Sequence, residues 1–423
     1  MSGGTLIVGA GQAGVQVAAS LRESGYQDSI TLVGAETHHP YARPPLSKEF
    51  LAGHAELKSL ELRTSDFYSV QRIEVLPAER VVEVHLSADG NEGSGTAVTA
   101  TGRELQFDKL ALTTGARPRR LDLNGAELEG VCYLRVIEDA HLLRSLLADA
   151  QNAVVIGGGF IGLEAASAAR SAGKTVTVVE AAERLVPRSV APVISEFLLN
   201  AHKRRGVEIR LGAQVTALHG VDGHVTAVEL GDGTQVPADL VIVGVGIIPR
   251  TELAEQIGLD CDRGIVVDTY ARTSIPSIVA AGDCTVLPNP LTGEGRYRLE
   301  STQNAMSQAR IAAASIMGNL QPHNSVPWFW SDQYDLKLQI AGLTDGYDDH
   351  VVRGEPDSES FSVLYYRHGR LLAVDAINRA PDYLAVRAAL GRRATINPGP
   401  AANPSVLLKT LIIEDESIPV TQP

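Results

Sequence analysis

Cysteine is scarce in this chain and widely spread. Only three cysteines occur in 423 residues, Cys132, Cys261 and Cys284, and no two of them form a CxxC motif or have the spacing of a zinc site. The histidines show no ligand spacing either, so no metal is expected. Such sparse cysteine usage is typical of a reducing compartment, and we therefore expect a cytoplasmic protein without structural disulfides.

Long hydrophobic runs and excess positive charge are also absent. No stretch approaches the roughly 18 uninterrupted apolar residues that a transmembrane helix needs. The N-terminus lacks the basic and hydrophobic regions of a secretory signal. The formal net charge is −13, whereas nucleic acids and anionic membranes attract a basic face. We therefore expect neither nucleic acid nor membrane as a partner.

Glycine, in contrast, is plentiful, with 40 residues, and several of them stand between strand and helix patterns. Apolar runs alternate with helical patterns as far as about residue 250, which is the rhythm of βαβ units in a parallel sheet. From about Val326 the pattern predicts an antiparallel sheet and then a short helix over 381–391. The proline-rich segment 397–404 is expected to be an extended connector.

These patterns predict the α/β fold class with two Rossmann-like dinucleotide-binding domains and a C-terminal α+β cap. The first domain is discontinuous, residues 1–112 and 245–325, because strand patterns in Ile265–Cys284 are expected to return to the first sheet. The second domain is residues 113–244, and the cap is residues 326–423.

The first glycine motif, "GAGQAG", follows a strand and begins a helix. Gly9 permits the tight turn, Gly11 lets a pyrophosphate approach the backbone, and Gly14 lets the helix pack on the sheet. The helix N-terminus offers N–H groups and a partial positive charge to the phosphates. An acid after the second strand should hold the ribose hydroxyls; Glu36 is the candidate, with Ala35 beside it.

The second motif, "GGGFIG" at residues 157–162, repeats this arrangement, and Glu180 ends its second strand. A glutamate there accepts hydrogen bonds from a 2′-hydroxyl and repels a 2′-phosphate, which favours NADH over NADPH. Arg184 and Arg188 lie nearby and could weaken that preference. Glycines that serve turns alone are the alternative, but two motifs with acids at matching offsets predict two dinucleotide sites.

The segment "IVAAGDC", Ile278 to Cys284, indicates which site holds a flavin. An apolar strand that ends at Gly282 and Asp283 places a carboxylate at the carboxyl edge of the sheet, where ligands gather. Asp283 could then bind the ribityl chain of FAD, whereas a turn or helix cap is the simpler alternative.

Seven segments in order, "GAGQAG", "PYARPPLSK", "TTGARP", "GGGFIGLE", "GVGIIP", "AAGD" and "PWFWSDQY", resemble the FAD-dependent, NADH-linked ferredoxin reductases. The resemblance covers nearly the whole chain, and "RPPLSK" and "FWSDQY" are its most specific parts. It implies a glutathione-reductase-like fold and non-covalent FAD. It also implies hydride transfer from NADH to FAD, and then single-electron transfer to a [2Fe-2S] ferredoxin that supplies a cytochrome P450 or another oxygenase such as a dioxygenase.

The motifs and the resemblance together imply two sets of cofactor contacts. The FAD set is Gly9, Gly11, Ala13, Gly14, Ala35, Glu36, Arg43, Lys48, Val81, Arg135, Gly282, Asp283, Thr302 and Trp330. The NAD set is Gly157, Gly159, Ile161, Gly162, Glu164, Glu180 and Gly246. Relatives often carry an acid where Ala35 stands, so whether Ala35 or Glu36 meets the FAD ribose stays open. Trp330 could be either core packing or a wall beside the flavin.

Lys48 and Glu164 are the candidate catalytic residues. A disulfide reductase needs a thiol pair downstream of the second strand, and no cysteine occurs between Gly34 and Lys48. Electrons must then leave the flavin directly. The family suggests that Lys48 pairs with Glu164 and bridges the two domains, so that its cation stabilises the charge that accumulates on flavin reduction. A solvated loop lysine is the alternative.

Small ferredoxins are typically acidic, so a chain of charge −13 needs a local basic rim to attract one. The candidates for this rim are Arg310, Arg387, Arg392, Arg393 and Lys409, although a solvated helix face explains each of them almost as well. We expect a monomer. Alternative functions are reduction of rubredoxin or another small redox protein, and flavin-based signalling like that of apoptosis-inducing factor. An NADH oxidase or peroxidase is disfavoured because its cysteine is missing.

Overall fold

The structure is a computed structural model that describes residues 3–87, 93–292 and 295–414. The chain forms two compact units, and the sequence crosses between them several times. The first unit comprises Met1–Arg43, Glu56–Arg117 and Ile247–Pro327. The second unit comprises Pro44–Ala55, Pro118–Gly246 and Trp328–Pro423.

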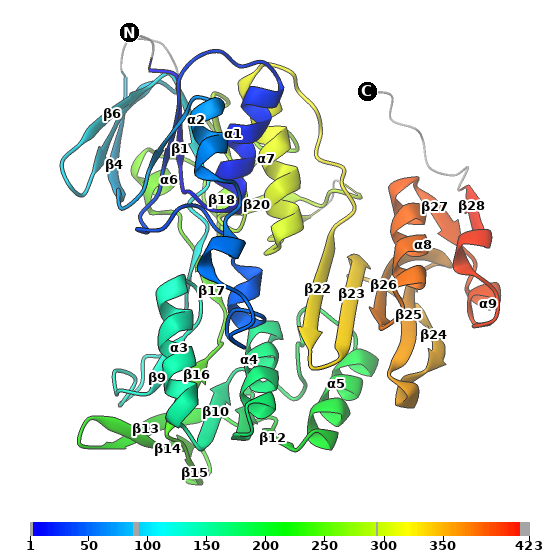
Figure 1. Ribbon diagram of the computed structural model, residues 1–423. Coiled ribbons are helices and arrows are strands. Elements are labelled where there is room, and N and C mark those ends of the chain that lie inside the picture. Colours follow the sequence, from blue (N-terminus) through cyan, green and yellow to red (C-terminus); the bar gives the residue numbers. More distant parts are fainter. Residues whose placement is uncertain (1–2, 88–92, 293–294, 415–423) are drawn as a thin grey trace. The chain divides into compact units, whose positions relative to one another are not determined.

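A five-stranded parallel sheet forms the centre of the first unit (Figure 1). Its strands, in spatial order, are β19 (Ile278–Ala280), β7 (Lys109–Leu112), β1 (Thr5–Val8), β2 (Ile30–Val33) and β3 (Ile73–Leu76). Two helices, α1 (Gln12–Glu23) and α7 (Thr302–Ile316), pack against each other and share one hydrophobic cluster with the sheet. This is the βαβ arrangement that the glycine motif predicts.

An antiparallel sheet shares the second hydrophobic cluster of this unit with the central sheet. Its strands are β4 (Val81–Leu86), β5 (Gly95–Thr99) and β6 (Glu104–Phe107). Between β4 and β5, residues 88–92 lie outside the described part of the chain. Shorter elements are η2 (Leu57–Leu60), α2 (Ser65–Val70), α6 (Glu252–Gln256), and the pair β8 (Ala116–Pro118) and β17 (Ile247–Pro249).

Only one of the strands expected to return to the first sheet does so. β19 pairs with β7, as predicted. β18 (Ile265–Val266) instead joins a separate small sheet with β20 (Thr285–Pro288) and β21 (Arg296–Tyr297). Pairing of Ile265 with Thr285 and of Val266 with Val286 holds β18 in that sheet. A turn follows, in which the Asp268 carboxylate accepts the main-chain N–H of Arg272 at 2.9 Å.

The second unit contains another five-stranded parallel sheet. Its strands are β12 (Val207–Arg210), β11 (Thr175–Val179), β10 (Asn152–Ile156), β16 (Leu240–Val243) and β9 (Val131–Tyr133). Its helices are α3 (Ile137–Asp149), α4 (Phe160–Ser171) and α5 (Pro192–Arg204), and β13 (Val215–Val221), β14 (His224–Leu230) and β15 (Gln235–Pro237) form an antiparallel layer. The two Rossmann-like sheets confirm the predicted fold class.

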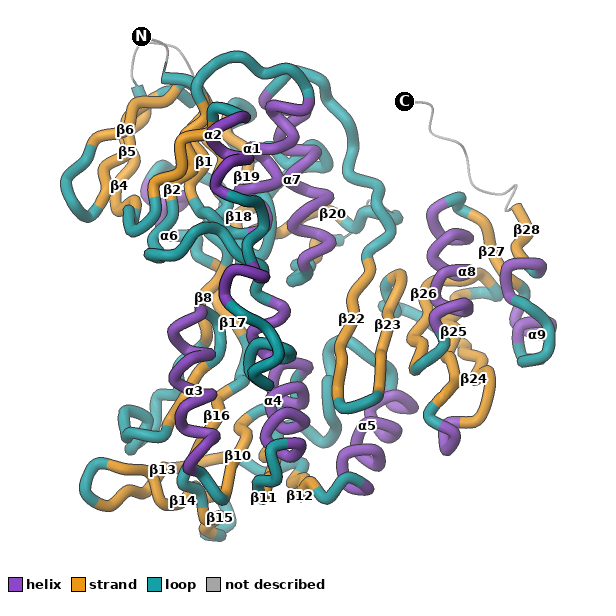
Figure 2. The backbone as a smooth tube through the Cα atoms, in the orientation of Figure 1, coloured by secondary structure: helices purple, strands orange, loops and turns teal. Residues whose placement is uncertain are grey.

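The C-terminal part of this unit is an antiparallel sheet, also as predicted (Figure 2). Its order is β22 (Trp328–Gln333), β23 (Leu336–Gly342), β26 (Arg370–Ile377), β25 (Ser360–Arg367) and β24 (Asp349–Glu355). Because side chains alternate along a strand, Phe361, Val363 and Tyr365 share a core with α5. On the other face Ser362 contacts Asp382 of α8 (Ala380–Gly391).

The proline-rich segment 397–404 is not wholly extended. It contains one helical turn, α9 (Pro398–Ala401). Proline is tolerated there because the first N–H groups of a helix have no acceptor within the helix. The last described elements are η3 (Pro356–Ser358), β27 (Ala394–Ile396), η4 (Leu408–Thr410) and β28 (Ile412–Glu414). Among the described residues, no helix is long and apolar enough to cross a membrane.

A buried arginine ties this C-terminal segment to the sheet. Arg353 of β24 is 1% exposed, and its Nε donates to Asp382 Oδ2 at 3.1 Å. Its terminal nitrogens donate to the carbonyl oxygens of Ala401 at 3.0 Å and of Val406 at 2.5 Å. The Arg353 guanidinium therefore satisfies backbone acceptors that have no strand partner, and it anchors the segment that follows α8.

We predict that Arg353→Met destabilises the C-terminal sheet by about 3 to 5 kcal/mol, because it leaves the Asp382 carboxylate buried without its main cation. Urea unfolding followed by tryptophan fluorescence measures this loss, since both tryptophans of the chain, Trp328 and Trp330, lie in this sheet. Arg367→Met, at an exposed position of β25, is the control and should change stability little. If the two variants are equally stable, Arg353 does not anchor the segment that follows α8.

Candidate active site

The first glycine loop leaves open space at the N-terminus of α1. Gly9 has φ +116°, and an added Cβ would lie 2.1 Å from the Thr113 carbonyl oxygen. A Cβ at Gly14 would lie 2.0 Å from the Gly9 oxygen, so helix and turn touch there. Gly11 differs, since nothing lies within 4 Å of its Cβ position. The loop therefore fits a pyrophosphate that approaches the backbone at Gly11.

The second loop repeats this geometry within the second unit. Gly157 has φ +109°, a Cβ at Gly162 would lie 2.1 Å from the Gly157 oxygen, and nothing lies within 4 Å of the Gly159 position. Ile161, in the first turn of α4, is 43% exposed although it is apolar. Gly246 has φ +99° and follows β16. Both loops thus have the close packing and the single open position that a dinucleotide requires.

Glu180 is held beside the second loop at the end of β11. Its Oε2 accepts the Gly158 N–H at 2.6 Å, and its Oε1 accepts the Ala182 N–H at 2.7 Å. Arg184, in contrast, is committed to the protein, because its Nη1 donates at 2.7 Å to the Val190 carbonyl oxygen. Of the two arginines that could weaken the preference for NADH, only Arg188 is exposed.

In the first unit, Glu36 and Arg43 form an ion pair. Arg43 Nη2 lies 2.5 Å from Glu36 Oε1, and the Tyr41 hydroxyl also donates to Glu36. Burial by itself lowers the pKa of Arg43, but the nearby Tyr41, Glu36 and Asp283 raise it overall. Ala35 is exposed and carries no polar side chain. Between these two neighbours, only Glu36 offers a side-chain acceptor, and it already pairs with Arg43.

Gly282 is the point where the N-terminal turns of α1 and α7 converge. Its φ is +90°, and a Cβ there would lie 3.2 Å from Ala13 Cβ and 3.7 Å from Ala305 Cβ. Asp283 follows it and is half-buried, and Thr302 begins α7. Two helix N-termini and a carboxylate therefore meet at the carboxyl end of β19. Val81 differs from this group, since it is 8% exposed and packs in a hydrophobic core.

Lys48 and Glu164 form a buried ion pair. The Lys48 Nζ lies 2.7 Å from Glu164 Oε2, and the side chains are 13% and 5% exposed. The Ser47 hydroxyl donates to the same oxygen at 2.7 Å, and the Ser331 hydroxyl donates to Oε1 at 2.7 Å. All four residues belong to the second unit, because Pro44–Ala55 packs with it. The pair therefore lies within one compact unit, although we expected it to bridge two domains.

Sequence reasoning missed Ser47 and Ser331. Both stand inside the motifs "RPPLSK" and "FWSDQY", which were the most specific signals, but no role was assigned to either serine. The motif "RPPLSK" forms the 3-10 turn η1 (Pro44–Ser47), after which the Lys48 N–H donates to the Pro45 oxygen at 3.0 Å. Prolines fix φ at the start of this turn and hold Lys48 close to α4.

Trp330 lies on the face of β22 opposite Ser331. Its ring centroid is 5.6 Å from that of Trp328, and both rings are half-buried. The Arg387 guanidinium stands 4.9 Å from the Trp328 ring, so this rim candidate is a cation–π partner of the sheet. Arg135 is half-buried directly before α3. The other rim candidates are exposed, with Arg310 in the first unit and Arg392, Arg393 and Lys409 in the second.

The cysteines cannot carry electrons by thiol exchange. All three are free, Cys132 and Cys284 are buried, and Cys261 is partly buried. Burial raises the pKa of the Cys132 thiol and of the Cys261 thiol to about 11, and it raises that of Cys284 as well. All three thiols stay protonated at neutral pH, whereas exchange requires a thiolate.

Comparisons with known proteins agree with this arrangement. The family described as pyridine nucleotide-disulphide oxidoreductase matches residues 4–309, and the family described as reductase C-terminal matches residues 328–412. Rhodocoxin reductase of Rhodococcus erythropolis is 44% identical over 407 residues, which cover 96% of this chain and 94% of that protein. A rubredoxin-NAD(+) reductase of Pseudomonas putida is 41% identical over 373 residues, covering 88% and 95%.

A solved structure extends this likeness to three dimensions. The chain matches the crystal structure of the covalent putidaredoxin reductase–putidaredoxin complex with a TM-score of 0.91 and 42% identity, covering 96% of this chain and 97% of that one. The glutathione-reductase-like fold and the resemblance to ferredoxin reductases are confirmed. The chain therefore belongs to the pyridine nucleotide-disulphide oxidoreductase family and is an oxidoreductase that uses FAD and NADH.

Proposed function

We propose that this protein is an NADH-dependent ferredoxin reductase, which takes electrons from NADH and delivers them to a [2Fe-2S] ferredoxin. The observation that carries the proposal is the ion pair of Lys48 and Glu164 in a chain whose three cysteines are all free and none fully exposed. Bound FAD supplies the conversion of a two-electron donor into single-electron steps. The relatives named rhodocoxin reductase and putidaredoxin reductase support this choice of partner.

We assign FAD binding to residues 1–112 and 245–325, NADH binding to residues 113–244, and the cap to residues 326–423. In the first of these regions, the open position at Gly11 receives the pyrophosphate, and Asp283 accepts hydrogen bonds from ribityl hydroxyls. In the second, Gly159 receives the NADH pyrophosphate, and Glu180 accepts from the adenosine ribose. Arg135 and Trp330 complete the flavin contacts.

Lys48 supplies positive charge, and the protein holds that charge in place. The Glu164 carboxylate receives two serine hydroxyls in addition to the ammonium group, so its acceptors are occupied and it has little freedom to rotate. A cation fixed in this way stabilises negative charge that develops nearby, and no reorganisation is needed when the charge appears. The same cation remains in place while electrons leave one at a time.

The ferredoxin would in turn supply a cytochrome P450 or a dioxygenase, and the protein would act as a cytoplasmic monomer. The exposed arginines Arg392 and Arg393 at the end of α8, together with Lys409, give the C-terminal cap a local positive surface on a chain of charge −13. Rubredoxin is the second candidate partner, since a rubredoxin-NAD(+) reductase is also similar over most of the chain. A signalling role like that of apoptosis-inducing factor has no such support.

We predict that Lys48→Met slows the reduction of FAD by NADH about tenfold to a hundredfold, which corresponds to losing one charge-assisted hydrogen bond. Stopped-flow absorbance of the flavin measures the rate, and equilibrium dialysis measures FAD retention, which should change much less. Lys58→Met, at an exposed lysine of η2, is the control. Equal losses of rate and of FAD retention in Lys48→Met would reject the catalytic assignment.

Cofactor choice gives a second test. Glu180→Gln removes the negative charge that repels a 2′-phosphate, so we expect kcat/KM for NADPH relative to that for NADH to rise about tenfold or more. Steady-state dye reduction with each cofactor measures the ratio. Glu183→Gln changes an exposed neighbour and should leave the ratio unaltered. If the Glu180 variant also keeps the wild-type ratio, this residue does not set the preference.

The partner gives a third test. Reduction of cytochrome c by NADH should depend on added [2Fe-2S] ferredoxin and should slow as ionic strength rises, because salt screens the attraction between exposed charges. Reduction of a neutral quinone should not respond to salt.

The matched variants for this experiment are Arg392→Gln, which should weaken the salt dependence, and Arg144→Gln on α3, which should not. Turnover that is as fast without ferredoxin as with it would argue against this partner. Stronger dependence on rubredoxin than on ferredoxin would favour the second candidate.

A further inference from the structure

One face of β22 turns three side chains towards α4 and α5. Phe329 packs its ring 4.7 Å from that of Phe160, at the start of α4. Ser331, two residues further along the strand, forms a hydrogen bond with Glu164. Gln333, another two residues along, forms a hydrogen bond with His202 near the end of α5. This spacing of two is that of a strand, so the motif "FWSDQY" aligns these groups along one line.

The hydrogen bonds along this line all point in one direction. A carboxylate oxygen only accepts, so the Ser331 hydroxyl donates to Glu164 Oε1 at 2.7 Å. Gln333 Nε2 in turn donates to Ser331 Oγ at 3.1 Å. His202 Nε2 lies 2.8 Å from Gln333 Oε1, and because an amide oxygen also only accepts, this imidazole must carry its proton on Nε2.

All members of this line are shielded from water. Ser331 and His202 are 0% exposed, Gln333 is 1% exposed, and Glu164 is 5% exposed. Burial lowers the pKa of His202 below its usual value, so the imidazole is neutral near pH 7. Its Nδ1 has no hydrogen-bond partner among the described residues. In such surroundings a chain of hydrogen bonds is polarised, and a broken link leaves a buried group unsatisfied.

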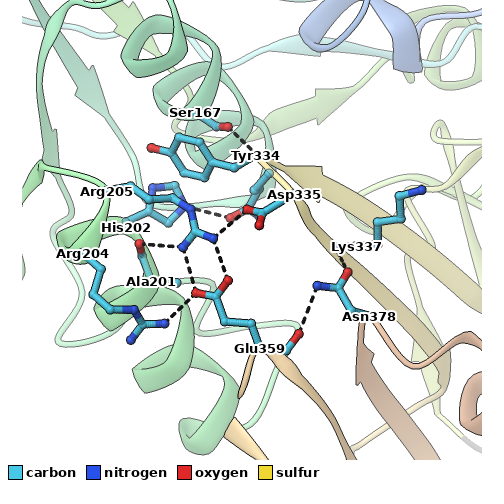
Figure 3. A network of polar contacts seen from close by, with 11 residues as sticks. Ser167, Ala201, His202, Arg204, Arg205, Tyr334, Asp335, Lys337, Glu359 and Asn378 are labelled. Atoms are coloured by element: carbon cyan, nitrogen blue, oxygen red, sulfur yellow. Dashed lines mark hydrogen bonds and ion pairs between the residues drawn. The ribbon is translucent and has the colours of Figure 1, made fainter. Parts of the chain in front are cut away.

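The far end of the line is held by a polar cluster at the end of α5 (Figure 3). The centroids of the Tyr334 and His202 rings are 5.3 Å apart, and the main-chain N–H of Tyr334 donates to Ser167 Oγ at 2.7 Å. The Arg205 guanidinium lies 5.2 Å from the centre of the Tyr334 ring and forms an ion pair with Glu359 at 2.7 Å. The basic segment 202–206 therefore contains a buried histidine and an anchored arginine.

We propose that Ser331, Gln333 and His202 form a positioning relay that orients Glu164 and, through it, Lys48. The inference rests on the proposed function and deepens it. With Oε1 held by Ser331, the carboxylate presents Oε2 to Ser47 and Lys48 in one orientation. None of the three relay residues needs to touch the cofactor. Their effect on catalysis passes through the position of the Lys48 ammonium group.

The first test is a double-mutant cycle in the FAD-loaded enzyme. Ser331→Ala should lower the limiting rate of flavin reduction by NADH about tenfold, the effect of one hydrogen bond to a charged group, while the dissociation constant of NADH stays the same. In the Lys48→Met background, Ser331→Ala should have no further effect, because the relay acts through Lys48. Fully additive effects would overturn the relay.

Ser362→Ala is the matched control for this cycle. Ser362 is also 0% exposed and donates at 2.6 Å to a buried carboxylate, that of Asp382, but on the other face of the same sheet. Ser362→Ala should lower the free energy of unfolding in urea as Ser331→Ala does, but it should leave the rate of flavin reduction unchanged. If both serine variants slow the reaction equally, the role of Ser331 is merely structural. Failure of the proposed function is seen separately, as a Lys48→Met enzyme that reacts at the wild-type rate.

The second test does not depend on activity. Long-range ¹H–¹⁵N spectra of the protein labelled at histidine should show His202 as the Nε2–H tautomer at neutral pH. Gln333→Glu replaces the amide with a carboxylate and should convert His202 to the imidazolium, while the signals of the exposed His224 should stay unchanged. An Nδ1–H tautomer in the wild-type protein would break the proposed direction of the relay and overturn it.

Discussion

The Glu164 carboxylate is the group through which separate segments of the second unit are held together. It is 5% exposed, and two segments that are far apart in the sequence supply its three side-chain partners. Ser47 ends the turn η1, Lys48 follows it directly, and Ser331 lies in β22. A buried charge of this kind is costly unless its partners are all in place, so it constrains the packing of η1, α4 and the C-terminal sheet together.

The Glu164 carboxylate matters for the proposed electron transfer because the thiols of this chain are not available to receive electrons. Members of a family named for disulphide chemistry would be expected to carry a reactive thiol pair, but Cys132, Cys261 and Cys284 are free and their pKa values are raised by burial. We propose that electrostatic control of the flavin depends instead on the fixed charge of the Lys48 ammonium group, which the hydrogen bonds around Glu164 keep in place.

The two glycine loops have the same arrangement of packed and open positions in both units. In each, the first and third glycines are in contact with backbone, and a side chain at either position would displace the turn or the helix. The middle glycine alone faces open space, at Gly11 and at Gly159. Packing therefore excludes a side chain at the first and third glycines, and a side chain at the middle glycine would obstruct the proposed approach of a pyrophosphate.

The sequence by itself determined the features that depend on local spacing. The glycine motifs, the acids Glu36 and Glu180, the parallel sheets, the antiparallel cap and the family all follow from short patterns, because each reports the conformation of its own segment. Only the tertiary structure decided that Pro44–Ala55 packs with the second unit, that Arg184 is committed to backbone oxygens, and that Ser331, Gln333 and His202 form one line. These relations join residues more than a hundred positions apart or choose among several possible partners, and no local pattern records which partner a side chain finds when the chain folds.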